Sequence, residues 1–487
     1  MDLNTITFGD QVAENEAATL STYFIETQAW KKLFSGEADI VFGSKGAGKS
    51  ALYTLLFYKK DTLSERDVFL VSAEKPTGKT VFSDISNEPP TDEAEFITLW
   101  KIYFCQLMVN WLIENNLCRG LAKTVKDKLV EAELIEEKNT IKRLLNSAKN
   151  FAKQLRRVEG LEAGVSIEGL VTGKITFHTP DQDMRNRGYS SVDELLDMLD
   201  EYLSSIRKTG WILCDRLDVA FDQSIDLEKN ALRALFKVYR DLEEYDSISL
   251  KIFLRDDIWK RITKDGFREA SHITKDITIS WNSKNLLNLV VSRALHNNSI
   301  LELYDIESKE ILSDFERQEE FYYRMFPSQV DVGERQSQTF EWILSRIRDG
   351  LNNTPPRDLI HYYNEIIVQE INEQDVASNS VEEPNIFSRV AIKNATYEVS
   401  KTRIERTLFA EYPEFREDIL AFENKKAEHN IITLCEVWGV SSDIALLKAN
   451  NLSEIGFFEL KTAKDEKVYK IPFIYRFYLN VIQGKAY

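Results

Sequence analysis

The chain has 487 residues, which is long enough for about two to four domains and a large core. Hydrophobic residues make up 43% and charged residues 29% of the sequence, as is ordinary for a soluble globular protein. The net charge of −17 excludes a protein that binds nucleic acid over its whole surface. Any nucleic-acid contact has to be local, or has to be made by an assembled oligomer.

The cysteines and the N-terminal residues indicate the cellular compartment in which the protein is expected to act. The four cysteines lie far apart and form no C-x-x-C pair, which fits a reducing cytoplasm without disulfides. The five histidines form no cluster with cysteine, which argues against a zinc site. No basic stretch followed by an apolar core opens the chain, and we expect no apolar run to approach the length needed to span a bilayer. We therefore expect a cytoplasmic protein that acts without a membrane.

A mixed aromatic and polar segment, residues 23–30, precedes the first predicted strand. Phe24 or Trp30 is a candidate for stacking on an adenine base. Core packing of an N-terminal helix explains the same pattern at least as well. The sequence leaves both interpretations open.

A phosphate-binding loop follows the short buried strand predicted at residues 38–42. Residues 43–50 read Gly-Ser-Lys-Gly-Ala-Gly-Lys-Ser and satisfy G-x-x-x-x-G-K-[ST], and an apolar helix is predicted directly after them. The glycines let backbone N–H groups surround phosphate oxygens, Lys49 is expected to reach the β- and γ-phosphates, and the Ser50 hydroxyl is expected to hold Mg²⁺. The predicted ATP-binding residues are Gly43, Ser44, Lys45, Gly46, Ala47, Gly48, Lys49, Ser50 and Ala51.

A second buried strand is predicted at residues 67–72, and a long apolar helix at 96–115. Residues 119–157 stand out by charge within a predicted helical insertion at about 116–180, because they hold eleven basic and five acidic side chains. Their apolar residues recur at helical spacing, so one face is apolar and the other basic. This pattern fits a solvated helix, and it also fits an arm that binds nucleic acid or a partner.

Residues 210–215 predict a buried strand that ends in a carboxylate, Asp215. Ligands of open α/β sheets bind at this carboxyl edge of the strands. Asp215 is therefore predicted to hold Mg²⁺ together with Ser50, whereas the alternative is a turn residue that ends the strand. Asp218 lies three residues further on and is a candidate to orient or deprotonate the attacking water.

Another buried strand is predicted at residues 249–254, and it ends in Arg255. A polar residue at this tip is expected beside the γ-phosphate, as a sensor of its state. A salt bridge from Arg255 to Asp256 or Asp215 is the alternative. With a last strand at 276–281, strands alternating with helices predict an α/β fold, a parallel sheet with helices on both faces.

The second half of the chain is predicted to be mostly helical. We expect a P-loop core at residues 1–282, a helical lid at 283–368, a linker at 369–389 and a winged-helix-like domain at 390–487. In the lid, Pro355-Pro356 starts a helix and places Arg357 in its first turn. The last domain reads as helices followed by a hairpin with a charged tip, and residues 391–487 hold fourteen basic and fourteen acidic side chains. This neutrality leaves DNA binding and packing both open.

In this order, the motifs resemble those of AAA+-like ATPases of the STAND and origin-recognition type. The group that the chain is most similar to comprises bacterial P-loop ATPases of anti-phage and other conflict loci. The matching stretches are residues 43–50, 215–218 (Asp-Arg-Leu-Asp), 253–258 (Phe-Leu-Arg-Asp-Asp-Ile), 356–360 (Pro-Arg-Asp-Leu-Ile) and the hairpin at 456–475.

The resemblance implies a role for three residues. Asp215 becomes the metal-side carboxylate, Asp218 lies near the catalytic water, and Arg357 is similar to a lid arginine that touches the γ-phosphate. Relatives usually carry an acidic residue directly after the second aspartate, where this chain has Val219. This difference favours a slow, switch-like ATPase.

These features lead us to expect an ATP-driven switch. ATP and Mg²⁺ are expected to bind, subunits to assemble into a homo-oligomer with Arg293 as a candidate arginine finger, and a separate effector, such as a nuclease, to be regulated. The resemblance implies a role in anti-phage defence. An ATP-dependent DNA-binding or loading protein that uses the winged helix and the basic arm is the alternative. A nucleotide-binding scaffold without turnover is the third candidate.

Overall fold

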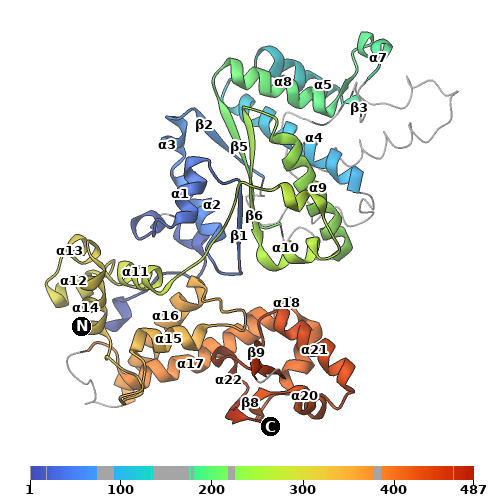
Figure 1. Ribbon diagram of the computed structural model, residues 1–487. Coiled ribbons are helices and arrows are strands. Elements are labelled where there is room, and N and C mark those ends of the chain that lie inside the picture. Colours follow the sequence, from blue (N-terminus) through green and yellow to red (C-terminus); the bar gives the residue numbers. More distant parts are fainter. Residues whose placement is uncertain are drawn as a thin grey trace. The chain divides into compact units, whose positions relative to one another are not determined.

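The computed structural model describes residues 2–17, 19–73, 93–132, 134, 175–176, 180–217, 225–376, 385–463 and 466–487. These residues form two compact units (Figure 1). We call residues 28–43 and 49–279 the sheet unit. Residues 1–27, 44–48 and 280–487 form the helical unit, so the tip of the phosphate-binding loop is counted with the second half of the chain.

The sheet unit is built on a five-stranded sheet in which every pair of neighbouring strands is parallel. Its order is β2-β5-β6-β1-β7, so β6 lies between β1 and β5. The strands are β1 (Ile40–Gly43), β2 (Val68–Ser72), β5 (Thr209–Cys214), β6 (Ile248–Arg255) and β7 (Asp276–Thr278). All four residues of β1 are buried, as the apolar runs of a sheet covered on both faces require. The predicted parallel α/β sheet and its five strands are confirmed.

Helices lie on both sides of this sheet, with α1 to α3 on one side and α4, α9 and α10 on the other (Figure 1). A short parallel pair, β3 (Ile175–Thr176) with β4 (Ser190–Ser191), and a 3-10 helix at Arg268–His272 complete the unit. The helices are α1 (Gln28–Ser35), α2 (Lys49–Tyr58), α3 (Lys60–Ser64), α4 (Glu93–Glu114), α5 (Gly120–Glu131), α7 (Gln182–Asn186), α8 (Val192–Ser205), α9 (Ile225–Leu242) and α10 (Asp256–Thr263).

One helix corrects an expectation about apolar runs. In the described part of the chain, Phe96–Glu114 of α4 is long and apolar enough to cross a membrane by length and composition, so the expectation that no run reaches that length was wrong. Most of this stretch is buried, including Trp100, Tyr103 and Phe104, and α4 packs against α8 and α9. The core helix of a globular unit passes the same test of length and composition.

The helical unit begins with the N-terminal segment, although residues 1–282 were predicted as one core. This segment forms 3-10 helices at Leu3–Thr5, Ala13–Glu16 and Leu20–Thr22, and its apolar side chains join the core of the lid helices. Those helices are α11 (Ser283–Ala294), α12 (Asn298–Tyr304), α13 (Ser308–Leu312), α14 (Phe315–Met325), α15 (Thr339–Ile347) and α16 (Pro356–Val376). Helix α16 thus extends through residues 369–376 of the predicted linker, and residues 377–384 lie outside the described residues.

The C-terminal module, residues 389–487, has helices before a hairpin, as the sequence predicts, and one strand lies among the helices. Its sheet has the order β11-β8-β10-β9, and β9 and β10 form the antiparallel hairpin. The side chain of Asn430 caps α20, and Gly439 ends that helix in the left-handed region. The elements are α17 (Arg389–Arg403), a π-helical turn (Ile404–Leu408), α18 (Phe409–Glu411), a 3-10 turn (Pro413–Phe415), α19 (Arg416–Leu420), β8 (Lys426–His429), α20 (Ile431–Trp438), α21 (Ser442–Glu454), β9 (Glu459–Ala463), β10 (Glu466–Lys470), α22 (Phe473–Arg476) and β11 (Ile482–Lys485).

Candidate functional site

The phosphate-binding loop connects β1 to α2, as its sequence predicts. Gly43 ends the strand and Lys49 begins the helix. Gly46 and Gly48 have φ angles of 79° and 107°, which side chains rarely adopt. The loop therefore has the glycines where its backbone needs them, and its last residues open a helix whose N-terminal end favours anions.

In the sheet unit, the loop and the end of β5 bring two predicted metal ligands together. The Ser50 hydroxyl donates to Oδ2 of Asp215 over 3.1 Å, and Asp215 is only 5% exposed. A hydroxyl and a carboxylate are oxygen ligands of the kind that Mg²⁺ prefers. The Lys49 ammonium donates to the carbonyl oxygen of Gly43 over 2.8 Å. This hydrogen bond holds the positive charge of Lys49 against the backbone of the phosphate-binding loop.

Arg255 and its neighbours occupy the tip of β6, in register with the phosphate-binding loop. Parallel pairing aligns Arg255 with Gly43. Among the described residues, the Arg255 guanidinium makes a double contact with the carboxylate of Asp257, at 3.0 and 2.8 Å, whereas the sequence suggested Asp256 or Asp215 as its ion-pair partner. Burial raises the pKa of the Asp256 carboxyl, and the charge of Lys49 opposes this rise. The strand thus places a charged cluster beside the loop.

Within the helical unit, the loop tip is held by residues of α16 and of the segment before α11. Trp281 Nε1 donates to the carbonyl oxygen of Ala47 over 2.8 Å. Arg357 N contacts the carbonyl oxygen of Gly46 over 3.5 Å, and a Cβ at Gly46 would lie 3.0 Å from the Arg357 Cβ. A side chain at position 46 would therefore crowd Arg357, so this position of the loop requires glycine. The sequence does not predict this contact of Trp281 with the loop, because the pattern at residues 276–281 indicates only a strand.

The arrangement fits a nucleotide polyphosphate with Mg²⁺. Nε of Arg357 is buried and has no hydrogen-bond partner among the described residues. An unpaired buried guanidinium N–H next to a glycine loop is a group that an anionic ligand satisfies. Lys49 and the loop backbone would hold the phosphates, and Ser50 and Asp215 would hold the metal, which would polarise the phosphoryl oxygens.

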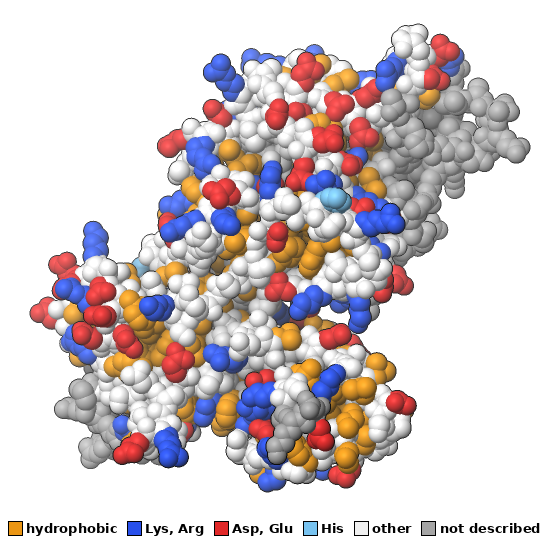
Figure 2. All heavy atoms as spheres, viewed as in Figure 1, with side chains coloured by type: hydrophobic (Ala, Val, Ile, Leu, Met, Phe, Trp, Pro, Cys, Tyr) orange, Lys and Arg blue, Asp and Glu red, His pale blue; other side chains and the backbone are white. Residues whose placement is uncertain are grey.

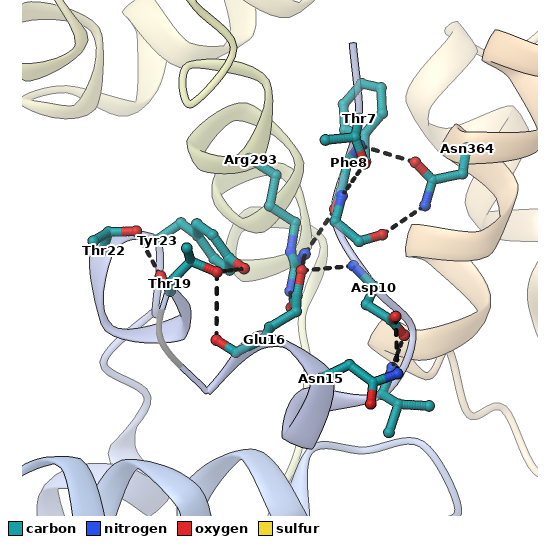
Figure 3. Close-up of polar contacts among 12 residues, drawn as sticks. Thr7, Phe8, Asp10, Asn15, Glu16, Thr19, Thr22, Tyr23, Arg293 and Asn364 are labelled. Atoms are coloured by element: carbon teal, nitrogen blue, oxygen red, sulfur yellow. Dashed lines mark hydrogen bonds and ion pairs between the residues drawn. The ribbon is translucent and has the colours of Figure 1, made fainter. Parts of the chain in front are cut away.

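Arg293 does not fit the role of an arginine finger, and this candidate was wrong. Its side chain is buried, makes an ion pair of 2.8 Å with Glu16 and donates to the carbonyl oxygen of Phe8 over 2.7 Å (Figure 3). The guanidinium also lies over the ring of Tyr23, 4.5 Å from its centroid. A finger has to extend from the subunit surface into a neighbour, whereas Arg293 fastens the N-terminal segment to α11.

Other predicted functional residues have different outcomes. Trp30 is buried in α1 and stacks on Phe34, at 4.9 Å between ring centroids, which supports the core-packing interpretation. Phe24 is half-buried, and its role in base stacking stays a prediction. Asp218, Val219 and most of the basic arm at 119–157 lie outside the described residues.

Comparisons with known proteins give no family for this chain. No family model matches it, and no curated protein matches its sequence. Two solved structures from Aeropyrum pernix are similar over nearly the whole length. The ORC2 protein, in ADPNP-ADP complexes, is 11% identical with a TM-score of 0.29, and the match covers 98% of this chain and 97% of that one.

The second structure is the ORC1 protein in complex with DNA. It is 10% identical with a TM-score of 0.32, and the match covers 96% of this chain and 91% of that one. Scores of this size do not establish a common three-dimensional arrangement. The description of this chain as a P-loop α/β protein therefore depends on its own strand order and loop.

Proposed function

We propose that the protein is an ATP-operated molecular switch. It binds ATP with Mg²⁺ through residues 43–51 and Asp215, hydrolyses the nucleotide slowly, and changes its assembly state with the bound nucleotide. The observation that carries this proposal is the meeting of Lys49, Ser50 and Asp215 at the phosphate-binding loop. Positioning and charge stabilisation are most of what phosphoryl transfer to water requires.

The same proposal assigns the remaining roles. Asp218 orients the attacking water, Arg255 senses the γ-phosphate, and Arg357 contacts it from the lid. The contact of Arg357 with the loop tip supports the last assignment. The oligomer regulates a separate effector protein in anti-phage defence, and the resemblance in sequence to ATPases of conflict loci supports this assignment.

A DNA-binding role for the C-terminal module is the second candidate, and the winged-helix order of its elements favours it. In helix-turn-helix proteins the second helix of the motif, here α21, enters the major groove. The exposed face of α21 carries Ile444, Leu446 and Leu447, and Figure 2 shows hydrophobic side chains at the surface of this module. The one basic side chain of α20 and α21, Lys448, is paired with Asp418 at 2.5 Å. Since Lys and Arg supply the electrostatic part of DNA affinity, α21 is poorly suited to DNA, and we favour the switch.

The experiment that tests the proposal measures mass in solution together with phosphate release. Wild type and Lys49→Ala are compared with Mg²⁺ and either ATP or a non-hydrolysable ATP analogue. The proposal expects the analogue to drive wild type into a discrete larger assembly, ATP to be turned over slowly, and Lys49→Ala to do neither. If the mass of wild type does not change with nucleotide, assembly as the output is refuted. DNA binding at low salt is then the measurement that decides for the second candidate.

A further inference from the structure

A second lysine of the phosphate-binding loop is engaged by the C-terminal module. The ammonium of Lys45 makes an ion pair with Oε1 of Glu411, and both residues belong to the helical unit. The Lys45 side chain is 33% exposed and that of Glu411 16% exposed, so the carboxylate is largely shielded from water. The pair spans 366 residues of sequence, which no local pattern predicts.

Glu411 is held in place by the helix that it ends. Helix α17, the π-helical turn at Ile404–Leu408 and α18 follow one another without a break, and Glu411 is the last residue of α18. Arg403, immediately before the π-helical turn, donates to Asp358 over 3.1 Å and contacts Asp349 at 3.4 Å. Since Asp358 follows Arg357 in α16, the helix bearing Glu411 is tied to the helix start that contacts Gly46.

The charge at this position is opposed to the proposed ligand. A phosphate-binding loop offers N–H groups and cations to a polyanion, and Lys45 is one of the two cations in residues 43–50. The Glu411 carboxylate neutralises that cation and adds a negative charge beside the loop. Because the pair is shielded, the repulsion between Glu411 and phosphate is weakened less by solvent than it is at a fully exposed surface.

We propose that Glu411 sets the nucleotide affinity of the loop, because its contact with Lys45 and the binding of a nucleoside polyphosphate oppose each other. This inference depends on the proposed nucleotide binding. Linkage makes the opposition reciprocal. If the contact weakens nucleotide binding, the bound nucleotide weakens the contact by the same factor. The helix of residues 389–411, which begins the C-terminal module, is therefore the element that responds to nucleotide.

The test compares Glu411→Gln with Glu414→Gln, an exposed carboxylate three residues further on that serves as the matched control. Dissociation constants for ADP and for a non-hydrolysable ATP analogue, each with Mg²⁺, are measured by calorimetry on the full chain. Glu411→Gln should bind both about tenfold more tightly, the order expected for removing one unit charge beside a polyanion at a partly buried site. Glu414→Gln should bind as wild type does.

A second measurement separates this role from a merely structural one. Amide hydrogen exchange in residues 404–411 should rise in wild type when ADP and Mg²⁺ bind, and in Glu411→Gln it should already be raised without nucleotide. If wild type binds nucleotide and Glu411→Gln binds equally or more weakly, the inference is overturned and the proposed function stands. If neither protein binds nucleotide, the proposed function itself is overturned, and the inference with it.

Discussion

The buried ion pair between Glu16 and Arg293 should decide whether the N-terminal segment stays attached to the lid helices. Both oxygens of Glu16 accept from the guanidinium, at 3.0 and 2.8 Å, and Oε1 also accepts from the backbone N–H of Asp10. The two side chains are only 7% and 6% exposed, so water cannot replace either partner (Figure 3). Removing one partner of such a pair costs about 3–5 kcal/mol, because the other charge is left buried.

We expect Glu16→Gln to cost about 3 kcal/mol, at the low end of that range. The glutamine oxygen still accepts one bond, and the Phe8 carbonyl and the Tyr23 ring still face the cation. The segment should therefore open about 100-fold more often, since 1.4 kcal/mol corresponds to a factor of ten. Amide hydrogen exchange of residues 2–17, in wild type and in the variant, measures this factor directly.

The exposed Glu26 gives a matched control in the same segment, and Glu26→Gln should leave the exchange unchanged. Replacing both partners, as Glu16→Met with Arg293→Met, removes the stranded charge and should restore more than half of the lost protection. If the exchange rate of residues 2–17 rises less than about fivefold in Glu16→Gln, the reasoning is refuted.

Three further outcomes are expected. Asp215→Asn should abolish the strengthening of ATP binding by Mg²⁺, whereas metal-free binding should become tighter, because a buried negative charge beside the polyanion is removed. Calorimetry with and without EDTA checks both effects; an unchanged Mg²⁺ effect excludes Asp215 as a metal ligand. Burial lowers the pKa of His429 below its ordinary value of 6.5. As the pH falls, His429 is therefore protonated in the unfolded chain before it is protonated in the folded one. The free energy of unfolding should fall below about pH 6.5, by up to about 1.4 kcal/mol per pH unit. Urea unfolding between pH 5 and 8 measures this slope, which His429→Gln should reduce. Lys251→Met should destabilise the sheet unit by about 3 kcal/mol in urea unfolding, because the buried Asp39 loses the cation that donates to it over 2.5 Å and keeps Lys275 at 3.7 Å and the Tyr239 hydroxyl at 3.3 Å; a loss below about 1 kcal/mol contradicts this.

The elements with local signals could be predicted from the sequence. Four of the five strands of the sheet are mostly apolar runs, β7 being the exception, and the loop at residues 43–50 has the spacing of a phosphate site. These signals depend on neighbours in the sequence, so a single chain is enough to read them.

Contacts between distant segments could not be predicted in this way. Glu16 and Arg293 are 277 residues apart, and an arginine on an amphipathic helix looks the same in sequence whether it faces a partner subunit or a buried carboxylate. The pairing of Lys45 with Glu411 and the assignment of residues 2–17 to the helical unit share this cause. Side-chain pairing across hundreds of residues depends on the packed fold, which propensity and spacing do not describe.

The place of β6 in the sheet has a consequence for synthesis of the chain. Strand β1 is flanked by β6 and β7, which leave the ribosome more than 200 residues after it. At about 5–20 residues per second, the strand that carries the phosphate-binding loop waits roughly 10–40 s for its first neighbour. Until then its apolar residues are unpaired, which is the condition in which nascent chains aggregate or recruit chaperones. Ribosome-bound chains ending before residue 248 should therefore not bind ATP, however complete their loop is.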